Sequence, residues 1–249
     1  YCGEWIESHC LHIHLLAAPD FLGYASVPEM ARDHPEIVRR GLRLQALGND
    51  LIRLLGARSV HPVGACVGGF HRAPTLAEVA DMRARLHAAL LEAEALVHWT
   101  ATLPLPEAGQ DFVSVALRHP DEYPMNEGEV VSSTGFRTTA AEYETHFVEE
   151  QVSYSNALQS RRSGGVYLTG PLARLWLNYD RLHPVALESA RSCGVALPSR
   201  NPFVSIVARS VELVHALAEA IDIVRAYEEP DRARLDLPLQ AGRGAAASE

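Results

Sequence analysis

Five side chains that can carry chemistry lie within two helical turns near the start of the chain: Glu7, Ser8, His9, His12 and His14. Apolar residues recur around them at helical spacing, which predicts a helix that places His9 and His12 on one face at i, i+3. Two imidazoles on one face permit shared metal ligation, but a zinc site needs a third and a fourth ligand, and the local spacing supplies neither. The residues themselves therefore favour buried, hydrogen-bonded histidines.

The four cysteines, Cys2, Cys10, Cys66 and Cys193, are widely spaced and form no CxxC pair. No base accompanies Cys66 or Cys193 locally, so both are interpreted as small core residues rather than nucleophiles. Nothing at the start of the chain resembles a signal peptide. This cysteine usage favours a reducing, cytoplasmic setting.

Composition and charge restrict the class of protein. The chain has 249 residues, of which 47% are hydrophobic and 21% charged, and this composition is typical of a folded globular protein. Twenty-two basic and thirty-one acidic residues give a formal net charge of −9. That charge repels phosphate backbones and anionic lipid, so no nucleic-acid partner is expected. No apolar run reaches the roughly 18 residues of a membrane span.

The elements that must position these side chains are mostly helices. Apolar periodicity predicts helices over 5–18, ended by Pro19, then over 34–56, 76–97, 140–148, from 171 onward, and over 202–224. Capping boxes at 75–78 and 139–142 mark two of the starts, and Asn201-Pro202 marks the last. Turn residues and β-branched runs predict a hairpin within 59–74 and short strands at 112–116, 129–131 and 235–239.

This order of elements predicts a mainly α protein, a helix-rich bundle with a small β excursion. No repeat, charge block or low-complexity linker divides the chain, so residues 1–249 are expected to form a single domain. The first residues enter a helical pattern at once and the last follow a glycine pair. We therefore expect both ends to have been cut from a longer protein.

Several separated segments resemble the large (alpha) subunit of nickel-iron hydrogenases. They read WIESHCLHIHLLAAPDFLG from Trp5, then ARDHPEIVRRGLRLQALGNDLI, VHPVGACVGGFHRAPT, ETHFVEEQVSYSNALQSR and GVYLTGPLARLWLN. The resemblance runs through essentially the whole chain in order. Within that family it is most similar to the cytoplasmic branch whose partners reduce NAD(P) or a deazaflavin coenzyme.

The resemblance implies an oxidoreductase that splits hydrogen reversibly into protons and electrons at a nickel-iron centre held by four cysteine thiolates. In the family these ligands come as two CxxC pairs, which are expected upstream of Tyr1 and downstream of Glu249. A proline-arginine segment and a proton-relay glutamate are expected outside the chain as well. The 249 residues alone are thus expected to hold no metal ligand and no catalytic residue, and to be inactive.

The resemblance also gives the residues that are present supporting roles. Ser8 stands where many family members have an aspartate, and His9 and His12 match family histidines that lie beside the metal centre without coordinating it. His61 resembles a histidine that faces the small subunit and its nearest iron-sulfur cluster. Expected partners are this small subunit and the coenzyme-reducing subunits. The alternative is a non-catalytic homologue that keeps the fold as a scaffold in a redox complex.

Overall fold

The computed structural model describes residues 1–163 and 165–249, which fold into two compact units. The first, called here the helical unit, comprises Tyr1–Leu105, His183–Val195 and Arg209–Ala241. The second, called here the sheet unit, comprises Pro106–Leu182, Ala196–Ala208 and Gly242–Glu249. The expectation of a single domain stays a prediction.

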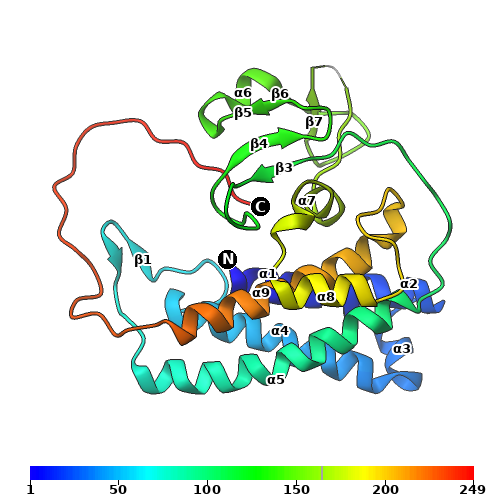
Figure 1. Cartoon of the computed structure of the whole chain (residues 1–249), viewed down its shortest axis with the longest axis horizontal. Helices are drawn as coiled ribbons and strands as arrows, with labels where there is room; N and C mark the ends of the chain where they lie inside the picture. The colour runs from blue at the N-terminus through cyan, green and yellow to red at the C-terminus, as the bar shows by residue number, and fades with distance from the viewer. Residues whose placement is uncertain (164) are drawn as a thin grey trace. The chain divides into compact units, whose positions relative to one another are not determined.

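Long helices build the helical unit (Figure 1). They are α1 (Cys2–Leu11), the π-helical turn η1 (His12–Ala17), α2 (Ala18–Leu22), α3 (Val27–Asp33), α4 (Pro35–Gly56), α5 (Leu76–Ala101), α8 (Pro184–Ser192) and α9 (Ser205–Arg225), which enters this unit at Arg209. Helix α1 packs along α4, and α5 contacts both α4 and α8. The apolar stripes anticipated from the sequence form the core between them, with Ile6, Leu86 and Leu217 completely buried.

The sequence predicts that the first helix ends at Pro19, but in the structure the helical path continues through Pro19 to Leu22. The π-helical turn η1 takes one more residue per turn than an α-helix, and Pro19 follows it in the first turn of α2, where a missing N–H is tolerated. Gly23 then ends α2 in the left-handed conformation, with φ 81°. The wider turn also shifts the side chains, so that Leu16 is 57% exposed while His14 is completely buried.

Two glycines allow α1 and α4 to approach closely. A Cβ atom at Gly48 would lie 2.5 Å from the backbone nitrogen of Glu7, and one at Gly41 would lie 2.4 Å from the Cβ atom of His14. Both distances are too short for carbon to occupy. Gly48 therefore fixes how α1 sits on α4, and Gly41 fixes how the following turn, η1, sits on it.

Most helix starts agree with the sequence signals. At the start of α5, Thr75 Oγ1 accepts a hydrogen bond from the backbone N–H of Glu78, whose carboxylate accepts one from Thr75 N–H, as the predicted capping box requires. Helix α4 ends at Gly56 as expected. Before α9, Asn201 caps a short 3-10 turn, η4 (Pro202–Val204), by accepting from Phe203 N–H.

A small hairpin follows α4 in the helical unit. Strands β1 (Ala65–Cys66) and β2 (Gly69–Phe70) pair antiparallel inside the predicted range 59–74. Ala233 accepts a hydrogen bond from Phe70 N–H, and Leu235 N–H donates to Gly68. The predicted strand 235–239 is wrong, because pairing along this segment is limited to the bridge at Arg234 and the residues beyond it are exposed.

The sheet unit contains two antiparallel sheets and short helices. Its elements are β3 (Val115–Arg118), β4 (Glu129–Ser132), β5 (Arg137–Thr138), the 3-10 turn η2 (Ala140–Glu142), α6 (Tyr143–His146), β6 (Phe147–Glu150), β7 (Gln159–Arg162), α7 (Pro171–Asn178) and the 3-10 turn η3 (Tyr179–Arg181). The strand orders are β3-β4-β5 and β6-β7. Helix α7 packs on β3, and the core cluster consists of Val115, Leu117, Val130 and Phe147.

Three sequence expectations in this unit need correction. The helix predicted over 140–148 ends at His146, because Phe147 is extended and buries its ring in the core cluster, stacked on Tyr143. The capping box predicted at Thr139 does not form there, since its side chain receives no cap hydrogen bond. The strand expected over 112–116 begins instead at Val115, while the strand at 129–131 is confirmed as β4.

The described residues thus form a helix-rich fold with three small sheets, which confirms the coarse fold class. None of the described helices combines the length and the apolar character that crossing a membrane requires.

Candidate functional site

The three residues predicted to support a metal centre lie together in the helical unit. Ser8 and His9 belong to the last turns of α1, and His12 opens η1. His9 is buried, with 7% of its surface exposed, whereas Ser8 and His12 are half-buried. The helix therefore presents one anchored imidazole and two partly accessible polar groups on neighbouring positions.

His9 is held from two directions. Its Nε2 atom lies 2.8 Å from Oε2 of Glu212 on α9, a residue with no exposed surface. The indole of Trp5 stacks on the imidazole, with ring centroids 5.5 Å apart and planes 11° from parallel. A buried carboxyl group is costly without a hydrogen-bonding partner, so this contact helps to hold α1 against α9.

The contact with Glu212 also sets the chemistry of the other ring nitrogen. Ser8 Oγ lies 3.5 Å from Nδ1 of His9, at the long end of hydrogen bonding. When the imidazole is neutral and Nε2–H donates to Glu212, Nδ1 is an acceptor for the Ser8 hydroxyl. The Ser8 hydroxyl and the His9 ring are thus placed to interact as donor and acceptor.

His12 is kept neutral by its surroundings. Burial, chiefly, and the nearby cations of Arg209 and His9 lower the pKa of His12 to about 4. No hydrogen bond to this side chain is found in the described part of the chain. At neutral pH His12 therefore offers an uncharged imidazole, which can accept a hydrogen bond from a further group.

Further polar groups line the same stretch of α9. Burial lowers the pKa of His215 to about 4, while Glu212 opposes and His183 reinforces that shift. The backbone N–H of His183 donates to Nδ1 of His215 at 3.0 Å, and His183 Nε2 lies 3.2 Å from Oδ2 of Asp222. A line of polar side chains thus runs from buried Glu212 to the exposed Asp222 along one helix.

His61 lies apart from this group. It precedes β1 in an exposed segment and has φ 49°, a left-handed conformation that histidine adopts more readily than most residues. Its carbonyl accepts a hydrogen bond from Arg58 Nε. The described hydrogen bonds and ion pairs do not join it to Ser8, His9 or His12, so its predicted role at a partner interface stays a prediction.

The residues described here do not fit a nickel-iron centre. Burial raises the pKa of the Cys10 thiol, and it raises that of Cys2 to about 11, so neither is an activated thiolate. Cys193 Sγ donates to the carbonyls of Ala190 and Val195. Among the described residues, no group of three or more histidine, cysteine or acidic side chains is placed to hold a metal ion.

Glu212 is the buried partner of His9 that the sequence signals did not reveal. The apolar stripe that includes Val211 and Val214 predicts a helix with one buried face. In the structure nearly every residue from 204 to 221 is buried, so polar residues outside the stripe are buried as well. A signal was available: Glu212 and His215 stand at i, i+3 within a helix that is otherwise apolar. Buried imidazoles such as His9 need polar partners, and an acid in an apolar helix is the natural one.

Comparison with known proteins shows that solved structures share the fold of this chain. No family model matches the chain. A solved structure described as an NAD+-reducing NiFe hydrogenase in the H2-reduced state superposes with a TM-score of 0.74 at 23% identity, covering 94% of this chain and 59% of that one. At that identity the likeness shows the fold, which is that of a hydrogenase large subunit.

Two curated relatives from Pyrococcus furiosus match nearly the whole chain. The sulfhydrogenase 1 subunit alpha is 29% identical over 253 residues, covering 100% of this chain and 59% of the relative. The sulfhydrogenase 2 subunit alpha is 29% identical over 244 residues, covering 97% and 57%. The homologues of this chain are therefore hydrogenase alpha subunits, and the chain spans less than two thirds of their length.

Proposed function

We propose that this chain is the central part of the large subunit of a nickel-iron hydrogenase, an oxidoreductase that interconverts hydrogen with protons and electrons. The observation that carries the proposal is the likeness to hydrogenase alpha subunits along the entire chain. A shared helical core alone would give a weaker argument, since one fold serves many functions.

In this proposal the nickel-iron centre is bound by cysteines outside the 249 residues, because this sequence contains no CxxC pair and the described residues form no group of three or more possible ligands. The part of the chain described here would be inactive by itself. Electrons would leave through iron-sulfur clusters of partner subunits.

The cluster of Ser8, His9 and His12 is proposed to lie beside the metal's ligands without coordinating it. Glu212 fixes the orientation and the tautomer of His9, and uncharged His12 offers a hydrogen-bond acceptor next to it. Outer groups of this kind orient the ligands of a metal and tune its chemistry. Ser8 contributes a hydroxyl, which forms a neutral hydrogen bond and no ion pair.

We further propose that His61 lies at the interface with the small subunit. Its exposed position and left-handed backbone hold the side chain away from the core of the helical unit. The other partners would be subunits that reduce NAD(P) or a deazaflavin coenzyme, in the cytoplasm. Neither nucleic acid nor a membrane span has a role in this proposal.

The test is purification of the gene product from its native host together with the subunits that accompany it. We expect hydrogen-dependent reduction of an artificial electron acceptor such as methyl viologen, with nickel and iron measured by elemental analysis. Nickel near one equivalent and turnover that scales with it would support the enzyme. A complex that contains no nickel and shows no turnover would establish the non-catalytic scaffold instead.

The 249 residues expressed alone give a second, independent measurement. Because thiolate pairs are lacking, we expect no stoichiometric nickel after washing with a chelator. A tightly bound equivalent of nickel would contradict the proposal that the ligands lie elsewhere.

A further inference from the structure

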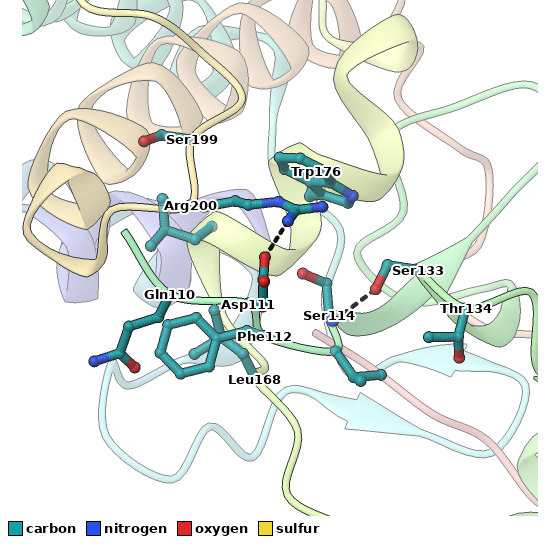
Figure 2. A pocket seen from close by; sticks show the side chains of 12 residues that line it. Gln110, Asp111, Phe112, Ser114, Ser133, Thr134, Leu168, Trp176, Ser199 and Arg200 are labelled. Carbon is teal, nitrogen blue, oxygen red and sulfur yellow. Dashed lines mark hydrogen bonds and ion pairs between the residues drawn. The ribbon is translucent and has the colours of Figure 1, made fainter. Parts of the chain in front are cut away.

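The sheet unit contains a pocket of about 360 Å³ that the proposed hydrogen chemistry does not use. Its walls come from the segment 110–114 before β3, the turn at 133–134 after β4, helix α7, and residues 199–200 (Figure 2). This volume lies within the range of about 300–1,000 Å³ that is usual for small-molecule sites.

One hydroxyl on the pocket wall has no protein partner. Ser114 has 6% of its surface exposed, and its Oγ makes no hydrogen bond in the described part of the chain, although its backbone is fully engaged. Figure 2 shows this side chain on the pocket wall between Asp111 and Ser133. Its hydroxyl is therefore available to donate a hydrogen bond to a ligand in the pocket.

A second hydroxyl is set up as a donor. Ser133 Oγ accepts a hydrogen bond from the backbone N–H of Ser114 at 3.0 Å, while Ser133 N–H donates to the Ser114 carbonyl at 2.9 Å. With a lone pair already used by the backbone, the Ser133 hydroxyl proton is left for a group in the pocket. The hydroxyl groups of Ser114 and Ser133 can therefore both donate a hydrogen bond to an acceptor in the pocket.

The positive charge of the pocket belongs to Arg200. Its guanidinium lies 4.9 Å from the centroid of the Trp176 ring, which holds the planar group in place. Asp111 forms an ion pair with it, but that carboxylate is 89% exposed, and an exposed pair of this kind contributes little and is readily exchanged. Asp111 thus occupies the position that an incoming anion would compete for.

The apolar part of the wall is formed by Phe112, Val113, Leu168, Leu172 and Trp176, and the polar side chains of Gln110, Thr134 and Ser199 complete the lining. We propose that this pocket binds a small organic monocarboxylate, with its carboxylate on Arg200, Ser114 and Ser133 and its apolar body against Leu168, Leu172 and Trp176. A single guanidinium, partly neutralised by Asp111, matches one negative charge better than the two charges of a phosphate monoester.

Benzoate is a suitable probe, because it combines one carboxylate with a flat apolar body. We expect isothermal titration of the purified protein to give saturable binding with a Kd of about 1 mM or tighter. Benzamide, which has the same shape without the charge, should bind at least about tenfold more weakly, because a hydrogen bond to an ionised group is the stronger one.

Three substitutions make the test specific. Arg200→Gln should weaken benzoate binding by about tenfold to 100-fold, and Ser114→Ala by about tenfold. Asp111→Asn should instead strengthen it several-fold, because it removes the competing carboxylate. Arg161→Gln, which alters an exposed arginine paired with Glu150 in the same unit, is the matched control and should change nothing.

Arg200 and Asp111 are exposed, so their variants are expected to fold, and a thermal melt of each verifies this. The proposal is overturned by the absence of saturable benzoate binding, by equal binding of benzamide, or by unchanged affinity in Arg200→Gln. Weaker binding in Asp111→Asn would overturn it as well, since it would show that Asp111 binds the probe rather than competes with it.

Discussion

The Nε2 atom of His9 lies 2.8 Å from Oε2 of Glu212, which is 203 residues further along the chain. Both side chains are buried, and they join the first helix to the last long one. This hydrogen bond closes a long loop of chain, so it reports directly on whether the helical unit is correctly assembled.

The first prediction concerns the stability of that contact. His9→Ala leaves the buried carboxyl group of Glu212 without this partner, so we expect the free energy of unfolding to fall by about 1–3 kcal/mol. Half-buried His12 makes no described hydrogen bond, and His12→Ala should cost less than about 1 kcal/mol. Urea denaturation followed by circular dichroism measures both. Equal losses in the two variants would show that the contact with Glu212 is not a stabilising one.

The second prediction concerns the packing of η1 on α4. Alanine is a better helix former than glycine by about 1 kcal/mol, so Gly41→Ala would normally stabilise a helix. Here the added Cβ would lie 2.4 Å from the Cβ atom of His14, and we expect a net destabilisation of about 1–3 kcal/mol. Leu42→Ala changes a half-exposed neighbour and serves as the control. A higher melting temperature in Gly41→Ala would refute the close approach.

Much of this fold could be predicted from sequence because the relevant signals are local. The Thr75 capping box, the Gly56 stop and the Asn201 cap depend on residues within a single turn, and the structure contains all three. The π-helical turn is not marked by such a local signal, and His14 within it packs against Gly41 on another helix, a contact that local periodicity does not report.

At the candidate site too, the local spacing is visible in the sequence and the long-range contact is not. The spacing of His9 and His12 on one helix predicts that they share a face, but Glu212, the partner of His9, lies 203 residues further along the chain. In the sheet unit, Phe147 lies outside the helix expected there, because its ring packs with Tyr143 and Tyr167 in a core that helical periodicity cannot reveal. Long-range packing overrides local preference at both places.

The third prediction is a pH dependence of stability that arises from His14. Its Nδ1–H donates to the Cys10 carbonyl, its Nε2 accepts from Arg40 Nε–H, and burial lowers its pKa to about 4. The unfolded chain, with a histidine pKa near 6.5, binds more protons than the folded protein between pH 4 and 6.5. Stability is therefore complete above pH 6.5 and falls as the pH drops through that window.

At pH 5 we expect His14 to account for about 2 kcal/mol of this loss relative to pH 7. His14→Gln cannot titrate, so the free energy of unfolding should depend less steeply on pH in that variant. His98→Gln, at an exposed position on α5, is the control. Parallel pH profiles for wild type and His14→Gln would show that His14 does not carry the effect.

The fourth prediction tests a buried ion pair in the sheet unit. Glu249 Oε2 lies 3.3 Å from Arg174 Nη1, the two side chains are 10% and 9% exposed, and Glu249 Oε1 accepts from the backbone N–H of Leu117. Glu249→Ala takes an ionic partner from a buried guanidinium, and we expect it to cost about 3–5 kcal/mol. Glu129→Ala breaks an exposed pair with Arg137 in the same unit and should cost less than about 1 kcal/mol.

Hydrogen exchange gives this prediction a local measurement. The Leu117 amide loses its acceptor in Glu249→Ala, so its protection should fall more than that of Val130 on the neighbouring strand. Unchanged protection at Leu117 would mean that the carboxylate does not hold this strand.

The last prediction concerns the helix cluster in the complete hydrogenase. If Ser8, His9 and His12 lie beside the metal's ligands, His9→Ala and His12→Ala should leave nickel bound and slow hydrogen turnover by about 10- to 100-fold, as is usual for groups that orient metal ligands. Ser8→Ala should cost less, because its contact with His9 is a long one of 3.5 Å. Histidines with a merely structural role would instead lower the melting temperature and leave activity per folded molecule unchanged. Turnover per bound nickel, measured beside the melting temperature, separates the two roles. Full turnover per nickel in both histidine variants, with a lower melting temperature in His9→Ala, would show that this helix supports the fold and not the reaction.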